Sequence, residues 1–194
     1  MSLALISPGH RLRPEAEACA RDVFRETYGA KVRELPLLLA AWQSFSGRIT
    51  AVTGLRTSAS GFFSEYYLPG PVETVLGRLA EASVERGRIL EFSTLASTDP
   101  NAAIALIGAL RINALHWGFD WAFFTATAPL RTLLRRQGIV LTELAAADPL
   151  RAPRAADWGS YYRTNPIVCA VPRAQTEARR RPGRQAHPVS PMFA

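Results

Sequence analysis

Residues 88–95, Arg-Ile-Leu-Glu-Phe-Ser-Thr-Leu, and residues 120–127, Asp-Trp-Ala-Phe-Phe-Thr-Ala-Thr, are the stretches that decide the fold. Each is a short run rich in apolar and aromatic residues, which is typical of a strand inside a sheet. A largely apolar helical segment, residues 101–117, lies between them; it follows Asp99-Pro100 and ends at Gly118. A strand, a helix and a strand in this order predict two parallel strands joined by a right-handed crossover.

The segments on either side extend this pattern into one sheet. Residues 37–45 and 48–56 flank the turn signal Ser46-Gly47 and are predicted to form an antiparallel hairpin at one edge. On the other side, a further helix and strand predict a third parallel strand. The predicted fold class is therefore α/β, a single mixed sheet with helices on both faces. The remaining predicted elements are helices at 14–28, 72–85 and 129–137, a short aromatic segment at 62–68, and strands at 139–144 and 167–171.

Length and composition indicate one domain followed by a tail. The chain has 194 residues, of which 48% are hydrophobic, so it can bury a core. We predict a domain at 1–171 and a flexible tail at 172–194, because the latter contains four prolines, five arginines and one acidic residue. The tail carries +4 (five positive, one negative) of the formal net charge of +7. The overall charge therefore permits an acidic, nucleic-acid or membrane partner without demanding one.

The sequence lacks the motifs of several common functional classes. Two cysteines and three histidines cannot assemble a metal site at plausible spacing, and His116 alone supports no His-based triad. Neither a phosphate-binding loop nor a dinucleotide-binding glycine motif is present. No uncharged run approaches the roughly 20 residues of a membrane span, and the first residues do not resemble a signal peptide. We therefore expect no transmembrane segment. Because the two cysteines are far apart in the sequence, we also expect a cytoplasmic protein.

Glu91 is the first candidate for chemistry, because it stands inside the predicted strand 88–95. A carboxylate buried there must be paired, hydrogen-bonded or protonated, and burial would raise its pKa toward the range of a general base. The alternative is a structural ion pair, for which Arg56 is the natural partner. Arg56 ends a predicted strand, where it either clamps a carboxylate or phosphate, or lies solvated at the sheet edge.

The other candidates carry carboxylate, hydroxyl or aromatic groups. Glu65 lies in the aromatic segment 62–68 and either belongs to the site or points outward from the edge of the core. Thr125 and Thr127 lie at the carboxyl end of a central strand, where open α/β sheets bind ligands, although threonine is also simply common in strands. Three aromatic residues either wall a pocket for an acyl chain or head group, or pack on the sheet: Trp158, Tyr161 and Tyr162.

Short sequence blocks between residues 24 and 171 carry a family resemblance. They are Tyr28-Gly-Ala30, Pro36-Leu-Leu38, Gly54-Leu-Arg56, Phe63-x-Glu65-x-Tyr67-Leu68, Pro71-Val-Glu73, Glu91-x-x-x-Leu95-Ala-Ser97, Phe124-Thr-Ala-Thr127, Ala147-Asp148, Trp158-Gly-x-Tyr-Tyr162 and Pro166-x-Val168. In this order they resemble the thermostable haemolysin family. Thr94 stands where that family has Asn, and Tyr66 where it tends to have Gln. More loosely, Gly54-Leu-Arg56 and Glu91-x-Ser-Thr94 are similar to acyl-homoserine-lactone synthases, which have Arg at the position of Thr94.

The resemblance implies a fold related to GNAT acyltransferases and acyl-homoserine-lactone synthases. In that fold the fourth and fifth strands separate and admit the arm of an acyl thioester. The implied activity is transfer of an acyl group from a carrier-protein or coenzyme A thioester to a small amine or amino-acid derivative, with no tightly bound cofactor. Glu91 would be the general base or hold the amine, Arg56 would hold the acceptor's carboxylate, and Glu65 would orient its amine. The residues expected to contact substrate are Arg56, Thr94, Thr125, Thr127, Trp158, Tyr161 and Tyr162.

The donor is predicted from what replaces the GNAT pyrophosphate-binding loop. The sequence there is Thr98-Asp-Pro-Asn-Ala-Ala103, which offers fewer backbone groups to the pyrophosphate of coenzyme A. An acyl carrier protein is therefore the favoured donor. We expect it to bind an arginine-rich surface formed by Arg131, Arg135 and Arg136.

Two functions of other classes stay open at this point. The family name describes a membrane-active lytic protein, although the sequence shows no amphipathic hairpin or long apolar segment. The third possibility is a basic nucleic-acid-binding module. Its arginines are not interleaved with aromatic residues in a recognisable reading motif, so no specific nucleic acid is expected. An enzyme is thus the leading hypothesis, and the sequence does not indicate the oligomeric state.

Overall fold

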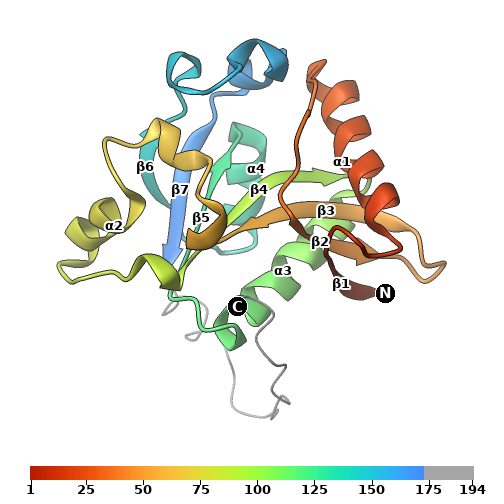
Figure 1. The fold of residues 1–194 in the computed structure, drawn as a ribbon, viewed down its shortest axis with the longest axis horizontal. Helices are drawn as coiled ribbons and strands as arrows, with labels where there is room; N and C mark the ends of the chain where they lie inside the picture. Colours follow the sequence, from red (N-terminus) through yellow and green to blue (C-terminus); the bar gives the residue numbers. More distant parts are fainter. Residues whose placement is uncertain (173–194) are drawn as a thin grey trace.

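A seven-stranded mixed sheet forms the centre of the protein in the computed structural model, which describes residues 1–172 (Figure 1). The strand order is β1-β2-β3-β4-β5-β7-β6, and among the neighbouring pairs only β4 and β5 are parallel. The mixed α/β class predicted from the sequence is confirmed. The strands are β1 Ser2–Ile6, β2 Leu38–Gln43, β3 Ile49–Arg56, β4 Ile89–Ser97, β5 Trp121–Ala126, β6 Thr142–Ala146 and β7 Ile167–Pro172.

Helices cover both faces of the sheet, as the sequence predicts. Side chains alternate along each strand, so Phe123 and Phe124 of β5 point to opposite faces. Phe123 packs in the cluster that contains α2, whereas Phe124 packs in the cluster that contains α4. The helix α1 lies on the α2 face, and α3 lies on the α4 face. The helices are α1 Arg13–Tyr28, α2 Val72–Ala80, α3 Pro100–His116 and α4 Ala128–Arg136, with 3-10 turns η1 Ser58–Ser60, η2 Ser64–Tyr67, η3 Arg86–Arg88, η4 Pro149–Arg151, η5 Ala155–Trp158 and η6 Tyr161–Thr164.

The predicted third parallel strand at residues 139–144 is wrong in position and partner. The strand there is β6, which begins at Thr142 and pairs antiparallel with β7; β7 itself lies between β5 and β6. Burial explains the order. The middle of β7, residues 168–171, is buried throughout, whereas β6 contains the exposed Glu143 and therefore suits the edge. Ile139 belongs instead to the small core beneath α4.

One further strand and two element boundaries differ from the sequence prediction. The first strand, β1, was not predicted, although it pairs with β2 along its whole length. Helix α2 ends at Ala80 rather than near residue 85, because Glu81 takes a left-handed conformation with φ of 50°. Pro172 closes β7, so it belongs to the domain rather than to the predicted tail; the remaining tail residues, 173–194, lie outside the described part.

Strands β4 and β5 separate at their carboxyl ends. They pair in register from Ile89↔Trp121 to Phe92↔Phe124, yet β4 runs on to Ser97 without β5 beside it. At the same level β4 is bulged against β3, where the register shifts and Thr94 has a φ of +51°. A bulge bends its strand and increases the local twist. The separation of β4 from β5 opens the sheet at this level.

Candidate active site

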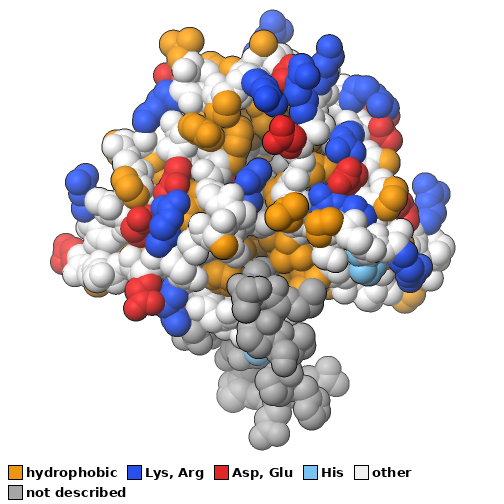
Figure 2. Space-filling model, viewed as in Figure 1, with side chains coloured by type: hydrophobic (Ala, Val, Ile, Leu, Met, Phe, Trp, Pro, Cys, Tyr) orange, Lys and Arg blue, Asp and Glu red, His pale blue; other side chains and the backbone are white. Residues whose placement is uncertain are grey.

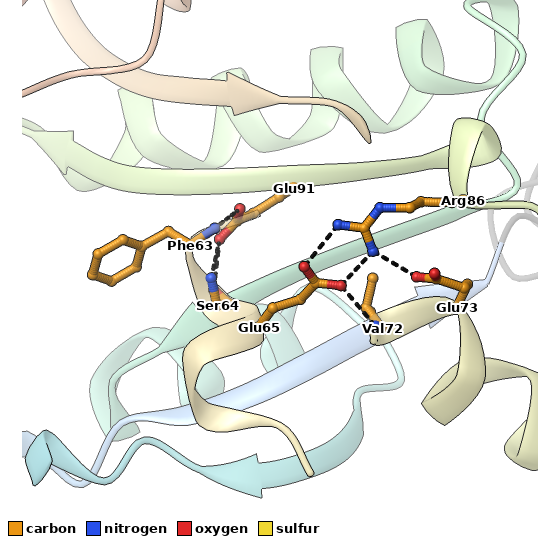
Figure 3. Close-up of polar contacts among 7 residues, drawn as sticks. All are labelled: Phe63, Ser64, Glu65, Val72, Glu73, Arg86 and Glu91. Carbon is orange, nitrogen blue, oxygen red and sulfur yellow. Dashed lines mark hydrogen bonds and ion pairs between the residues drawn. The ribbon is translucent and has the colours of Figure 1, made fainter. Parts of the chain in front are cut away.

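The carboxylate of Glu91 lies at the centre of the site, on β4. Its side chain is 0% exposed. Phe63 N donates to Oε2 at 2.7 Å, and Ser64 N and Ser64 Oγ donate to Oε1 at 2.8 and 2.7 Å (Figure 3). Burial raises the pKa of Glu91, while these hydrogen bonds and the nearby charge of Arg56 partly offset the rise. The carboxylate is thus held in place and has the altered pKa expected of a general base.

Arg56 lies opposite Glu91 in the β3–β4 register. The hydrogen bonds to the Glu91 carboxylate come from the loop that precedes and begins η2, and Arg56 acts on Glu91 through its charge. Arg56 Nε is buried and has no hydrogen-bond partner in the described part of the chain. A buried donor without a partner is costly. Arg56 also lines a large cavity, from which an acceptor group can approach its guanidinium.

Ser64 was not identified from the sequence. Ser64 is 2% exposed and joins two predicted site residues, Glu91 and Thr125. Its Oγ donates to Glu91 and lies 2.8 Å from Thr125 Oγ1. Its only signal in the sequence is its place beside Glu65 in the aromatic segment. A lone serine there does not reveal that the chain turns back onto β4.

Glu65 lies one residue further along, and its carboxylate faces away from Glu91. It binds Arg86, with a distance of 2.7 Å from Nη2 to Oε2, and accepts the Val72 amide at 2.8 Å (Figure 3). Burial raises the pKa of Glu65, but Arg86 and the Val72 amide outweigh this and hold it below its usual range. Arg86 also binds Glu73 at 2.6 Å and stacks on the Phe62 ring. The structure thus does not bring Glu65 together with the other predicted site residues.

Two of the three predicted aromatic residues face a large cavity. Trp158 and Tyr161 line it, and the Trp158 ring lies 5.7 Å from that of Phe63. Tyr161 also packs in the core under α1, so its side chain serves both packing and the cavity wall. Tyr162 instead bonds the hydroxyl of Tyr67 at 2.9 Å and packs against two core clusters.

Two cavities lie on opposite faces of the sheet at the separation of β4 and β5 and share lining residues there. The larger, about 450 Å³, lies on the α1 face between β4, η2 and the loops that carry Lys31, Arg33 and Trp158. The smaller, about 90 Å³, lies on the α3 and α4 face and is lined mostly by apolar side chains. Both are lined by Phe92, Thr94 and Thr125. Figure 2 shows the molecule from the view of Figure 1; apolar side chains reach the surface near the middle of the view, and charged side chains lie among and around them.

The two remaining threonines have different positions. Thr94 occupies the bulge and lines both cavities, as a substrate-contacting residue requires. Thr127 is 7% exposed and caps α4, where its Oγ1 accepts the Leu130 amide at 3.4 Å. It is not among the residues that line either cavity.

The predicted arginine surface loses one of its three members. Arg131 is 6% exposed and donates to the carbonyl oxygens of Ala126 and Asn165, both at 2.7 Å. It therefore ties α4 to the end of β5 and contributes little to the exposed arginine surface. Arg135 and Arg136 are exposed, and Arg135 binds Glu143 at 2.6 Å.

Within residues 1–172, no group of three or more His, Cys, Asp or Glu side chains could hold a metal ion. None of the helices in the same range is both long and apolar enough to cross a membrane.

The family model for thermostable hemolysin matches residues 6–176, which is most of the chain. The chain belongs to the thermostable hemolysin family. The family resemblance predicted from the sequence blocks is thereby confirmed. No curated protein matches this member of the family.

Solved structures with a similar fold include N-acyl amino acid and acyl-homoserine-lactone synthases. FeeM, an N-acyl amino acid synthase from uncultured soil microbes, superposes with a TM-score of 0.61 at 12% identity, over 92% of this chain and 98% of FeeM. The acyl-homoserine-lactone synthase LasI gives 0.59 at 10% identity, over 88% and 90% of the two chains. BjaI, a CoA-dependent acyl-homoserine-lactone synthase solved with SAM and isopentyl-CoA, gives 0.59 at 14%, over 90% and 84%. The fold is thus GNAT-like, as predicted.

Proposed function

We propose that this protein is an N-acyltransferase that moves an acyl group from a thioester to a small amine carrying a carboxylate. The observation that carries the proposal is a pair of unlike cavities that share lining residues at the separation of β4 and β5, beside Glu91 and Arg56. One cavity suits an apolar chain and the other a polar acceptor, and the two reactants would meet at Thr125. Holding both reactants in one place supplies much of the rate gain in such a reaction.

The smaller cavity would take the acyl chain. Its walls come from α3, α4, β4 and β5 and are mostly aliphatic or aromatic, including Leu110, Phe124 and Leu134. Apolar walls bind an acyl chain by removing it from water. The small volume, about 90 Å³, favours a short chain. The acyl chain thus lies across the sheet from Trp158 and Tyr161, the residues for which the sequence left an acyl-chain role open.

The larger cavity would take the acceptor. Arg56 supplies a guanidinium whose Nε lacks a partner, and a carboxylate is the group that a guanidinium binds best. Trp158, Phe63 and Tyr161 provide aromatic wall for the rest of the molecule. Lys31, Arg33 and Arg154 lie at the same cavity with Glu34 and Asp157, so the cavity carries more positive than negative groups. An amino acid or a close derivative fits this chemistry.

The start of α3 favours a carrier-protein thioester over coenzyme A. Pro100 opens the helix and has no N–H, and the Asp99 carboxylate already accepts the Asn101 amide at 2.9 Å. A pyrophosphate at this position would meet a negative charge instead of free amides. The phosphopantetheine arm of a carrier protein has no pyrophosphate and does not need free amides at this position. The exposed Arg135 and Arg136 on α4 offer positive charge to an acidic carrier.

The chemical step needs no covalent enzyme intermediate. The acceptor enters as an ammonium ion and loses one proton, whose final acceptor is Glu91. The neutral nitrogen attacks the thioester carbonyl carbon; a C–N bond forms, the C–S bond breaks, and the thiolate takes the second nitrogen proton. The products are an amide and a thiol, and Glu91 later returns its proton to water. General-base assistance of this kind contributes about a hundredfold to ten-thousandfold.

The test is direct assay of the purified full-length protein. Acyl carrier proteins and coenzyme A loaded with short acyl chains are each incubated with a panel of amino acids and with the matching amines that lack the carboxylate. Thiol release is followed with a colorimetric reagent, and the N-acyl product by mass spectrometry. We expect thiol and amide in equal amounts, with amino acids as the better acceptors. Absence of thiol release from every donor and acceptor pair would overturn the proposal.

The alternative of direct membrane lysis rests on the description of the family alone. It is tested with the same protein preparation. Purified protein at low micromolar concentration is mixed with dye-loaded liposomes, and we expect the vesicles to stay intact. Dye release without thioester consumption would favour the lytic function instead.

A further inference from the structure

Two hydroxyl groups connect the buried carboxylate of Glu91 to Thr125, a residue that lines both cavities. Ser64 Oγ is 2.7 Å from Glu91 Oε1, and Thr125 Oγ1 is 2.8 Å from Ser64 Oγ. Glu91 and Ser64 are 0% and 2% exposed, whereas Thr125 is half-buried and lines both cavities. Ser64 and Glu91 also border the larger cavity, but they are only 2% and 0% exposed, so Thr125 is the member of this group most open to a substrate.

The direction of these hydrogen bonds follows from counting protons. A hydroxyl has one proton to donate, and the Ser64 hydroxyl donates its proton in the hydrogen bond to the Glu91 carboxylate. When Glu91 is ionised and accepts the Ser64 proton, Thr125 is the donor to Ser64 Oγ in the contact between the two hydroxyls. The amides of Phe63 and Ser64 also donate to Glu91, so the three hydrogen bonds that the described residues donate to this carboxylate come from one loop. The hydroxyls form a single directed chain that ends on Glu91.

We propose that Thr125 and Ser64 relay the proton of the acceptor amine to Glu91. The proposal rests on the acyltransferase function proposed above. The ammonium group gives a proton to Thr125 Oγ1, Thr125 gives its own proton to Ser64 Oγ, and Ser64 gives its own to Glu91 Oε1. The amine becomes neutral, Glu91 becomes a neutral acid, and each hydroxyl keeps one proton with its hydrogen bond reversed. The reverse shift returns the proton to water after the product leaves.

The surroundings of the three groups support this role. Burial raises the pKa of Glu91, so it is a better proton acceptor than an exposed carboxylate. The amides of Phe63 and Ser64, the Ser64 hydroxyl and the charge of Arg56 act in the opposite direction and lower the pKa of Glu91. The hydroxyl of Tyr161 reaches the backbone oxygen of Thr125 at 3.5 Å and so helps to fix the end of β5.

The experiment compares hydroxyl-removing and hydroxyl-keeping variants on the best donor and acceptor pair of the wild type. Thr125→Val removes the first hydroxyl at nearly constant volume, and Thr125→Ser keeps it. Ser64→Ala removes the second, and the double variant removes both. Thr50→Val is the matched control, because Thr50 is also a strand threonine, bonds only backbone through its side chain, and lines neither cavity. Circular dichroism and thermal unfolding check that every variant is folded.

We expect Thr125→Val to lower kcat by about tenfold to a thousandfold with KM nearly unchanged, because proton removal and not binding is lost. Thr125→Ser should keep kcat within about threefold, and the double variant should be no slower than the slower single one, since both hydroxyls act in one chain. In the wild type and Thr125→Ser, kcat should rise with pH as Glu91 ionises. In Thr125→Val that rise should be lost.

Three results would contradict the relay. If Thr125→Val keeps the wild-type kcat and pH profile, the proton reaches Glu91 by another route, and the acyltransferase proposal stands without the relay. If Thr125→Ser loses as much as Thr125→Val, packing rather than the hydroxyl is responsible. If the wild type transfers no acyl group at all, the proposed function fails and the relay fails with it.

Discussion

The guanidinium of Arg86 holds both carboxylate oxygens of Glu65, and the same carboxylate accepts the amide of Val72. Glu65 directly follows Ser64, which binds Glu91 through both its amide and its hydroxyl. The Arg86–Glu65 pair therefore fixes the turn whose backbone positions the candidate base (Figure 3). In this arrangement Glu65 is a positioning residue, and the amine-orienting role expected from the sequence is not part of our proposal.

Replacing Arg86 with Leu should loosen this turn. Because Arg86 and Glu65 are partly exposed, the loss of unfolding free energy should be only about 1 kcal/mol. We expect a larger effect on kcat than on KM, since Glu91 loses its fixed partners. The contribution of the pair is present above the ordinary Glu pKa of 4.5 and is lost as pH falls through the lowered pKa of Glu65. Chemical denaturation and steady-state kinetics measure both quantities.

The matched control is Arg88→Leu, which breaks another arginine–carboxylate pair, with Asp120, at the surface. Arg88 lies close to Arg86 in sequence but does not contact the η2 turn through that pair. Equal losses of kcat in the two variants would contradict a specific positioning role for Arg86.

Glu91→Gln should slow acyl transfer by about a hundredfold or more, because the amide cannot accept the proton. It should also reveal the raised pKa of Glu91 in the stability of the protein. The wild-type unfolding free energy, minus that of the Gln variant, should be highest below the ordinary value of 4.5 and fall as pH rises through the folded-state pKa. Urea denaturation between pH 4 and 9 measures this difference. A difference that does not change with pH would contradict a raised pKa.

Gly54→Ala should destabilise the protein. A Cβ at this position would lie 2.4 Å from Pro36 Cγ and 2.7 Å from Ser93 Oγ. Relieving such overlap typically costs about 1–3 kcal/mol. Gly108→Ala is the control, because nothing lies within 4 Å of its Cβ and it stands inside α3; alanine there should raise the unfolding free energy by roughly 0.5–1 kcal/mol. Thermal unfolding of both variants checks the prediction, and the opposite order would contradict it.

Ala114→Leu should shorten the acyl chain that the protein accepts. Ala114 lines the smaller cavity from α3, and a larger side chain there fills part of its volume. We expect kcat/KM to fall most for the longest chain the wild type accepts, by about tenfold for one or two methylenes. Ala105→Leu is the control, since Ala105 lies on α3 but does not line that cavity. An unchanged chain-length profile would place the acyl chain elsewhere.

Much of the fold could be predicted from strand and helix patterns in the centre of the chain. Strands β4 and β5, the crossover helix α3 and the hairpin β2–β3 lie close to the predicted segments. The position of β7 between β5 and β6 could not be predicted, because it depends on a long return of the chain after β6. Local pattern does not encode such a non-local pairing, although the continuous apolar run of β7 is consistent with an interior strand.

Site residues could be predicted where their own type and position in the sequence stand out. They were missed where only the three-dimensional fold brings them to the site. A carboxylate inside an apolar strand stands out, so Glu91 could be found. Ser64 is an ordinary polar residue in a turn, and only the fold brings it to Glu91. In the sequence, Arg131 is one of three arginines on a predicted helix. In the structure it is buried against the end of β5 and the chain before β7, where it donates to the carbonyl oxygens of Ala126 and Asn165.

The central claim is that Arg56 selects an acceptor carboxylate while the amine of the same molecule attacks a thioester. The most direct measurement is N-acyl product formation by the wild type and by Arg56→Met, using an amino acid and the amine that differs from it only by lacking the carboxylate. We expect the wild type to prefer the amino acid, and Arg56→Met to raise KM for the amino acid by about tenfold or more while leaving KM for the amine nearly unchanged. Loss of the Arg56 charge beside Glu91 should change kcat for both acceptors alike. Equal use of both acceptors by the wild type, or an equal rise in KM for both in the variant, would contradict the claim.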